Sequence, residues 1–157
     1  MSKLSVFDNK AFLVKGTNVM IQTFEMMSDM DLNSSSDATL LHNIETEFNI
    51  TLPKQYFSFM QLHNGGEGPI GEYGYLAIWD TEELMSFNQT NGFKDNLFYF
   101  ASDRGGTLYA FDFNNHDTKI VELQEDEIDY SGVEIIANSF EEFISYIYGI
   151  DDGEYDI

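Results

Sequence analysis

The chain has 157 residues, and its 14 Phe, 9 Tyr and 1 Trp provide the bulk for the core of one domain. It carries 28 acidic and 7 basic residues, a formal net charge of −21, and no cysteine. The charge disfavours binding to nucleic acid or to an anionic membrane, and the lack of cysteine excludes disulfides, thiolate metal sites and cysteine nucleophiles.

The first residues, MSKLSVFDNKAFLV, have neither the apolar stretch nor the cleavage site of a signal peptide, and no apolar run approaches the roughly 20 residues of a membrane span. We therefore expect a soluble, cytoplasmic protein. After Lys119 there are 12 acidic residues and no Lys or Arg. Such a surface is either a solvated acidic face or an attractant for a basic protein, and charge alone leaves both interpretations open.

Three helices are predicted in the first half of the chain. The methionine-rich stretch 19–30 is consistent with a helix, and Ser36 or Asp37 can cap a second helix that runs to Phe48 and stops at Asn49. The apolar side of this second helix is predicted to consist of Leu40, Leu41, Ile44 and Phe48.

A third helix is predicted over 52–63, with Pro53 in its first turn and with Asn64 and Gly65 at its end. Its apolar positions cover a broad face: Tyr56, Phe57, Phe59, Met60 and Leu62. From residue 75 the pattern changes to strands, and YLAIW (75–79) is the first of them.

Asp80 is predicted to open a short helix, DTEELMSFN, with Glu83 in the capping-box position. Segments 97–101, 108–113 and 119–123 then predict three strands joined by short turns that contain Gly or Asn, which indicates an antiparallel meander. The turns between them are SDRGGT and NNHD.

A short strand over 133–136 is expected to precede a final helix over 139–149. Ser139 and Glu142 form a capping-box pattern, a single apolar stripe follows, and Gly149 ends the helix. The segment 150–157, IDDGEYDI, is expected to form an acidic tail. We predict one α+β domain over residues 1–157, with a central, mostly antiparallel sheet and helices packed on one side.

The pattern Gly66-x-Gly68-x-x-Gly71 has the spelling of a dinucleotide-binding loop. That loop needs a strand before it and a helix after it, whereas here a helix precedes the glycines and Pro69 lies among them. Glu67 and Glu72 would also repel a phosphate. We therefore interpret the segment as a helix stop followed by a flexible loop, and we predict no cofactor.

Catalytic and metal-binding patterns have little support in the sequence. There is no Gly-x-Ser-x-Gly motif, and His42, His63 and His116 have no ligand or triad partner at a recognisable spacing. The tail 151–154 does not match an EF-hand loop, and nothing singles out a pair among the acidic residues. We expect no enzyme activity and no bound metal.

Five segments occur in a specific order: IETEFNITLP, LPKQYFSFMQLHNGG, LAIWDTEEL, LFYFASDRGGTLYAFD and ANSFEEFISYIYG. Together they resemble the SUKH superfamily, which is named for fungal cell-wall regulators of the Smi/Knr type and is widespread in bacteria. The similarity covers about residues 37 to 149. The recurring positions are interpreted as mainly structural: Leu52, Pro53, Tyr56, Asn64, Gly65, Trp79, Glu83, Asp103, Gly106 and Phe140.

The resemblance implies the α+β fold described above, no established catalytic residues, and a role in binding proteins. Bacterial members commonly act as immunity proteins that neutralise toxin domains, often nucleases. We therefore hypothesise a non-catalytic bacterial immunity protein (an antitoxin) that binds a basic toxin domain through an acidic face. The alternatives are a regulatory scaffold of the Smi/Knr type and a small-ligand-binding domain.

Two surfaces are candidates for that face: residues 65–80 together with 102–106, and the acidic stretch 122–134. The first is preferred because it combines aromatic and acidic side chains. Its predicted partner-binding residues are Glu67, Glu72, Tyr73, Tyr75, Trp79, Asp80, Asp103 and Arg104.

Overall fold

The computed structural model describes residues 20–91, 93–128 and 132–151. Residues 20–26 are helical, as predicted for part of the methionine-rich stretch. The remaining helices are α2 (Ala38–Phe48), α3 (Lys54–Leu62), α4 (Thr81–Thr90) and α5 (Phe140–Tyr148), with short 3₁₀ turns η1 (Lys94–Asn96) and η2 (Glu125–Glu127).

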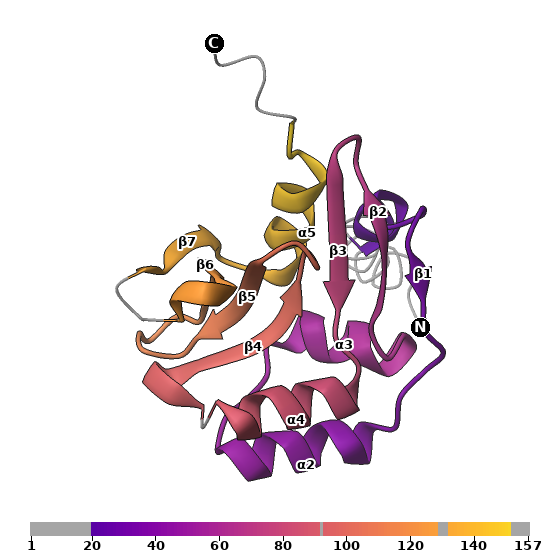
Figure 1. Ribbon diagram of the computed structural model, residues 1–157. Coiled ribbons are helices and arrows are strands. Elements are labelled where there is room, and N and C mark those ends of the chain that lie inside the picture. The colour runs from indigo at the N-terminus through magenta and orange to yellow at the C-terminus, as the bar shows by residue number, and fades with distance from the viewer. Residues whose placement is uncertain (1–19, 92, 129–131, 152–157) are drawn as a thin grey trace, which may run out of the picture.

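The strands are β1 (Asp31–Leu32), β2 (Gly66–Ile70), β3 (Gly74–Ile78), β4 (Leu97–Ser102), β5 (Thr107–Asp112), β6 (Lys119–Gln124) and β7 (Glu134–Ala137). They form one seven-stranded sheet in the order β1-β2-β3-β4-β5-β6-β7, and each pair of neighbours is antiparallel. The prediction of a single α+β domain with an antiparallel sheet is confirmed (Figure 1).

Three helices cover one face of the sheet, and aromatic rings form the contact. Phe48 of α2 packs against Phe98 of β4, with ring centroids 5.2 Å apart. Tyr56 of α3 and Phe143 of α5 both pack edge-on against Phe100, at 5.4 and 5.1 Å. Phe111 of β5 is the cross-strand partner of Phe98 and also packs against Phe100 and Tyr56, so these helices share one side of the sheet.

The helix α4 lies along the edge of β4 instead. The strand β3 pairs with β4 only near the end of β4, where Ala77 and Ile78 face Ser102 and Ala101. Beyond that point the side chain of Asn88, on α4, takes the place of a neighbouring strand: its Nδ2 donates to the Tyr99 carbonyl (2.8 Å) and its Oδ1 accepts from the Tyr99 N–H (2.9 Å). A buried side chain therefore completes the hydrogen bonding of the sheet.

The predicted helix signals are mostly confirmed. Asp37 caps α2 through the Thr39 N–H, Asn49 ends it with a left-handed backbone (φ 54°), and Ser139 caps α5 through the Glu142 N–H. The Glu142 carboxylate accepts from Asn138 N–H rather than from Ser139. Two leucines assigned to the apolar faces of helices are exposed instead: Leu40 at 46% and Leu62 at 54%.

The interpretation of the glycine-rich segment as a flexible loop is also wrong, because residues 66–70 form β2, which pairs with β3 along its whole length. The glycines make this possible by letting β1 approach closely. A Cβ on Gly66 would lie 2.6 Å from the Leu32 Cα, and one on Gly68 would lie 2.8 Å from the Met30 Cα. Ile70 is the one β-branched residue of the segment, so the usual sequence signal of a strand is weak.

Candidate functional site

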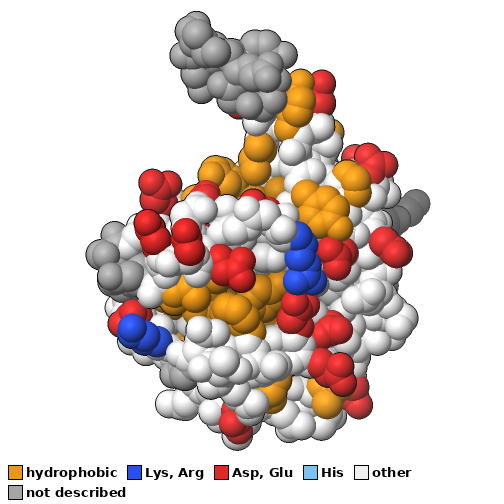
Figure 2. Space-filling model, viewed as in Figure 1, with side chains coloured by type: hydrophobic (Ala, Val, Ile, Leu, Met, Phe, Trp, Pro, Cys, Tyr) orange, Lys and Arg blue, Asp and Glu red, His pale blue; other side chains and the backbone are white. Residues whose placement is uncertain are grey.

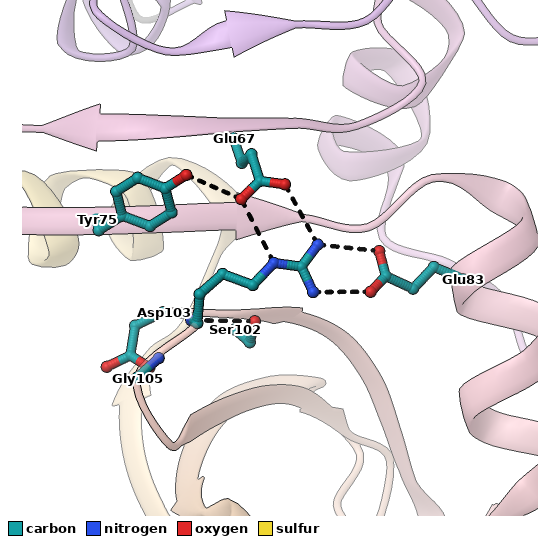
Figure 3. A network of polar contacts seen from close by, with 7 residues as sticks. Glu67, Tyr75, Glu83, Ser102, Asp103 and Gly105 are labelled. Atoms are coloured by element: carbon teal, nitrogen blue, oxygen red, sulfur yellow. Dashed lines mark hydrogen bonds and ion pairs between the residues drawn. The ribbon is translucent and has the colours of Figure 1, made fainter.

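The site is built around the turn between β4 and β5. The Asp103 carboxylate accepts hydrogen bonds from the backbone N–H groups of Gly105 (2.7 Å) and Thr107 (2.9 Å), which fixes the turn. Arg104 then has a left-handed backbone (φ 58°), and its own N–H donates to the hydroxyl of Ser102 at 3.3 Å (Figure 3). The turn thereby holds the side chain of Arg104 out from the end of the strands.

Arg104 is the only arginine of the chain, and two glutamates bind it. Its Nη1 and Nη2 contact the two carboxylate oxygens of Glu83 on α4, at 2.9 and 3.3 Å. Its Nε and Nη2 contact the carboxylate of Glu67 on β2, both at 3.4 Å. The guanidinium thus joins the β4–β5 turn, α4 and β2, and its planar fork suits this paired arrangement (Figure 3).

Tyr75 extends the network along β3, where its hydroxyl donates to Glu67 at 2.9 Å. This hydrogen bond is the main cause that lowers the pKa of Glu67, and the interaction with Arg104 lowers it further. The bond to Glu83 raises the pKa of Arg104. Both carboxylate and guanidinium therefore stay charged at neutral pH, and the network orients their charges in advance.

These side chains line a polar depression of about 480 Å³, which we call the Arg104 depression. Its charged lining residues are one guanidinium and four carboxylates: Arg104, Asp31, Glu67, Asp80 and Glu83. The guanidinium is already paired with two of the carboxylates. The depression therefore presents excess negative charge to any partner.

The second candidate surface directly adjoins the first. The backbone N–H of Glu125, at the start of η2, donates to the carbonyl of Gly106 in the β4–β5 turn at 2.7 Å. Gly105, Gly106, Gln124, Glu125 and Asp126 together line a shallow hollow of about 400 Å³. The structure thus joins part of the stretch 122–134 to the Arg104 turn, and acidic side chains outnumber basic ones on the face shown in Figure 2.

The predicted partner-binding residues have different positions in the structure. Glu67, Tyr75, Asp80 and Arg104 line the Arg104 depression, whereas Asp103 lies in the turn as a structural residue. Glu72 and Tyr73 are exposed in the turn between β2 and β3. Trp79 is only 3% exposed and packs against Phe87, so its selection as an interface residue is wrong.

Two charged residues of the depression, Asp31 and Glu83, were missed as partner-binding candidates. Glu83 was predicted to close a capping box, and its N–H does donate to the Asp80 carboxylate (2.8 Å), but its own carboxylate binds Arg104. Asp31 lies on β1, which the sequence did not predict. The signal in the sequence is that the chain has one arginine and 28 acidic residues, so this arginine is expected to pair with carboxylates.

Two of the three histidines make hydrogen-bond contacts within the fold. His42 Nδ1 lies 2.9 Å from a carboxylate oxygen of Glu45 on the same helix, and His63 Nδ1 lies 2.9 Å from the Asn33 carbonyl. Within residues 20–91, 93–128 and 132–151, His, Asp and Glu side chains form no cluster suited to a metal ion. In the same part of the chain, no helix has the length and apolar character required to cross a bilayer.

Comparison with known families gives one match. The family model described as SMI1 / KNR4 family (SUKH-1) matches residues 36–146, which is most of the chain and includes all the residues of the Arg104 depression except Asp31 and Asn33 on the β1 side. Domains of this family are protein-interaction modules and are generally non-catalytic. No curated protein matches the chain. The chain therefore belongs to the SMI1/KNR4 (SUKH-1) family.

Proposed function

We propose that this protein is a cytoplasmic, non-catalytic immunity protein that binds and neutralises a basic toxin domain, such as a nuclease. The observation that carries the proposal is the Arg104 depression: in a chain of net charge −21, the only arginine is paired with Glu67 and Glu83. Of the other two carboxylates of the depression, Asp80 caps α4 through the Glu83 N–H, and Asp31 is exposed to a basic partner.

Charge explains how such a partner would be captured. Nuclease domains are commonly basic because they bind a polyanion. An acidic face accelerates encounter with a basic protein, and the effect decreases as salt screens the charges over about 10 Å. Blocking a nuclease requires no chemistry, only an interface of about 1,600 Å² in total that covers its active site.

The fixed geometry of the network also supports a binding role. Glu67 is held by Tyr75 on one side and by Arg104 on the other, so its carboxylate does not have to be ordered when a partner arrives. Tyr75 is 40% exposed and offers an aromatic surface beside the charges. Preordered polar groups around an accessible tyrosine are typical of protein interfaces.

A regulatory scaffold of the Smi/Knr type is the second candidate, because family membership fits it equally well. The two roles differ in their partners: an immunity protein has one dominant partner encoded beside it, whereas a scaffold has several. The tagged protein is therefore incubated with lysate of its own species at about 50 mM and about 300 mM salt, conditions that differ in charge screening. One basic partner, captured less well at high salt, supports immunity, and several housekeeping proteins support the scaffold.

A pair of charge reversals then tests the face with the purified partner. Asp31→Lys changes an exposed residue of the Arg104 depression, whereas Asp117→Lys makes the same change of net charge in the turn between β5 and β6, at the other end of β5. Asp103 is unsuitable for this purpose because its carboxylate holds the turn. We expect Asp31→Lys to slow association several-fold at low salt. Equal association rates for the two variants would eliminate this face.

A further inference from the structure

A second depression lies between α2 and α4. It shares no lining residue with the Arg104 depression, although both use residues from the start of α4. It has a volume of about 530 Å³, and residues of both helices line it, among them Leu40, Asn43, Ile44, Glu82, Met85 and Gln89. We call it the α2–α4 groove. The two helices lie side by side in Figure 1.

The two helices run in the same direction. At one end of the groove Leu40 and Glu82, from the first turns of the helices, both line it. Toward the other end, Gln89 of α4 donates to the carboxylate of Glu47 on α2 at 3.4 Å. A helix of 11 residues is about 16 Å long, so the groove can accommodate about three turns of another helix.

The floor and walls of the groove contain apolar side chains. Ile44 is buried beneath it, Met85 packs partly against the core, and Leu40 is 46% exposed despite its place beside Leu41 on an amphipathic helix. Methionine adapts its shape to different partners. An exposed leucine beside a flexible methionine gives a surface that gains free energy when a second apolar surface covers it.

The charges around the groove define the occupant. Glu82 lines the groove and Glu47 contacts Gln89 near its far end, and neither α2 nor α4 contains a lysine or arginine. Glu45 and Glu83 bind groups outside the groove. A second copy of this chain would bring the same acidic residues and a net charge of −21 against them. A basic occupant instead finds apolar contacts in the groove and carboxylates along its rim.

We infer that the α2–α4 groove binds an amphipathic α-helix of a basic protein, with its apolar side on Leu40 and Met85 and its lysines or arginines near Glu47 and Glu82. This mode of recognition uses apolar anchors spaced three and four residues apart on the bound helix. The inference does not require the partner to be a toxin. It concerns a surface separate from the Arg104 depression, so either proposal can fail alone.

The probe is a synthetic helical peptide of about 15 residues, made of Leu, Lys and Ala, with leucines on one side. A peptide of the same composition in scrambled order is the control for charge. Binding is followed by amide NMR spectra and by titration. We expect the amphipathic peptide to shift the signals of α2 and α4 and to bind at least several-fold more tightly than the scrambled peptide.

Two matched variants test the apolar contact. Leu40→Asn removes the exposed leucine of the groove, and Leu62→Asn removes a leucine of α3 that is 54% exposed and does not line it. We expect roughly tenfold weaker peptide binding for Leu40→Asn and an unchanged affinity for Leu62→Asn. A third variant, Glu82→Gln, should reduce the salt dependence of binding without altering the fold.

Several results would overturn the inference. The two peptides could bind equally well, or the two leucine variants could have equal effects. The peptide could shift amide signals of the β4–β5 turn alone. It could also fail to bind at a concentration of about 1 mM, which corresponds to negligible affinity. Analytical ultracentrifugation of the protein alone tests whether a second copy of the chain occupies the groove. A dimer that Leu40→Asn dissociates would assign the groove to self-association instead.

Discussion

Asn88 is expected to be one of the most sensitive positions of the fold, although it is neither apolar nor near the Arg104 depression. Its side chain is completely buried and makes three hydrogen bonds: Nδ2 to the carbonyls of Leu84 (2.9 Å) and Tyr99 (2.8 Å), and Oδ1 from the Tyr99 N–H (2.9 Å). Asn88→Ala leaves the N–H and the carbonyl of Tyr99 without these partners, at the position where β3 has already left the edge of β4.

The expected loss follows from those two backbone groups. A buried polar group without a partner costs about 1–3 kcal/mol, so the free energy of unfolding should fall by about 4 kcal/mol in Asn88→Ala. For a domain of this size each kcal/mol shifts Tm by about 2–4 °C, so Tm should fall by roughly 10 °C. Thermal unfolding followed by circular dichroism measures the shift.

The matched control is Asn91→Ala, one turn of helix later. Asn91 Nδ2 donates to the Phe87 carbonyl at 2.8 Å, but the residue is only partly buried, so water can replace the bond. We expect a loss of about 1 kcal/mol or less. Asn88→Asp keeps the volume of the side chain and the acceptor for Tyr99, and should still be strongly destabilised because it loses both donated bonds. If Asn88→Ala and Asn91→Ala unfold at the same temperature, the role assigned to Asn88 is refuted.

Three further predictions use the glycines and the titrating groups. Gly68→Ala should destabilise the protein by about 2 kcal/mol or more, because its Cβ would lie 2.8 Å from the Met30 Cα, whereas Gly105→Ala, whose nearest neighbour is at 3.5 Å, should remain within about 0.5 kcal/mol in denaturant unfolding. Carbon NMR should find the pKa of Glu67 below that of an ordinary glutamate and should find it higher in Tyr75→Phe; an unchanged value in the variant would contradict the assigned cause. Because this pKa is lower in the folded protein, its contribution to stability is present above the ordinary glutamate pKa and is lost as the pH falls through the folded value. Tyr146, whose hydroxyl donates to a carboxylate, should titrate with a pKa of about 12, and an NMR titration midpoint near 10 would contradict this hydrogen bond.

Local patterns in the sequence predicted the elements whose signals lie within a few residues. The caps at Asp37 and Ser139, the stop at Asn49 and the meander from β4 to β6 all depend on neighbouring residues, and the structure confirms them. The strand β2 was missed because glycine can adopt the extended backbone of a strand but its presence in a sequence does not indicate one. Its identity depends on the close approach of β1, a contact between segments about 35 residues apart.

The Arg104 depression was likewise predicted in part from the sequence, and the rest depended on contacts between distant segments. The sequence identified Glu67, Tyr75, Asp80 and Arg104 as members of one surface from their chemistry and from the turn that contains Arg104. It did not identify which acids the arginine binds, because Glu83 and Glu67 lie 21 and 37 residues before it in the chain. It also could not separate Trp79, which is buried against Phe87 of α4, from Tyr75, which is 40% exposed, because the two residues occupy positions of the same parity in the segment.

The sequence by itself determined the net charge, most of the helices and strands, the α+β class and the family, because each depends on composition or on short-range order. The tertiary structure decided which carboxylates meet the single arginine, that Asn88 completes the hydrogen bonding of β4, and that Leu40 opens onto a groove rather than the core. These features depend on contacts between elements far apart in the chain: the packing of α4 against α2 and β4, and the approach of the β4–β5 turn to β2.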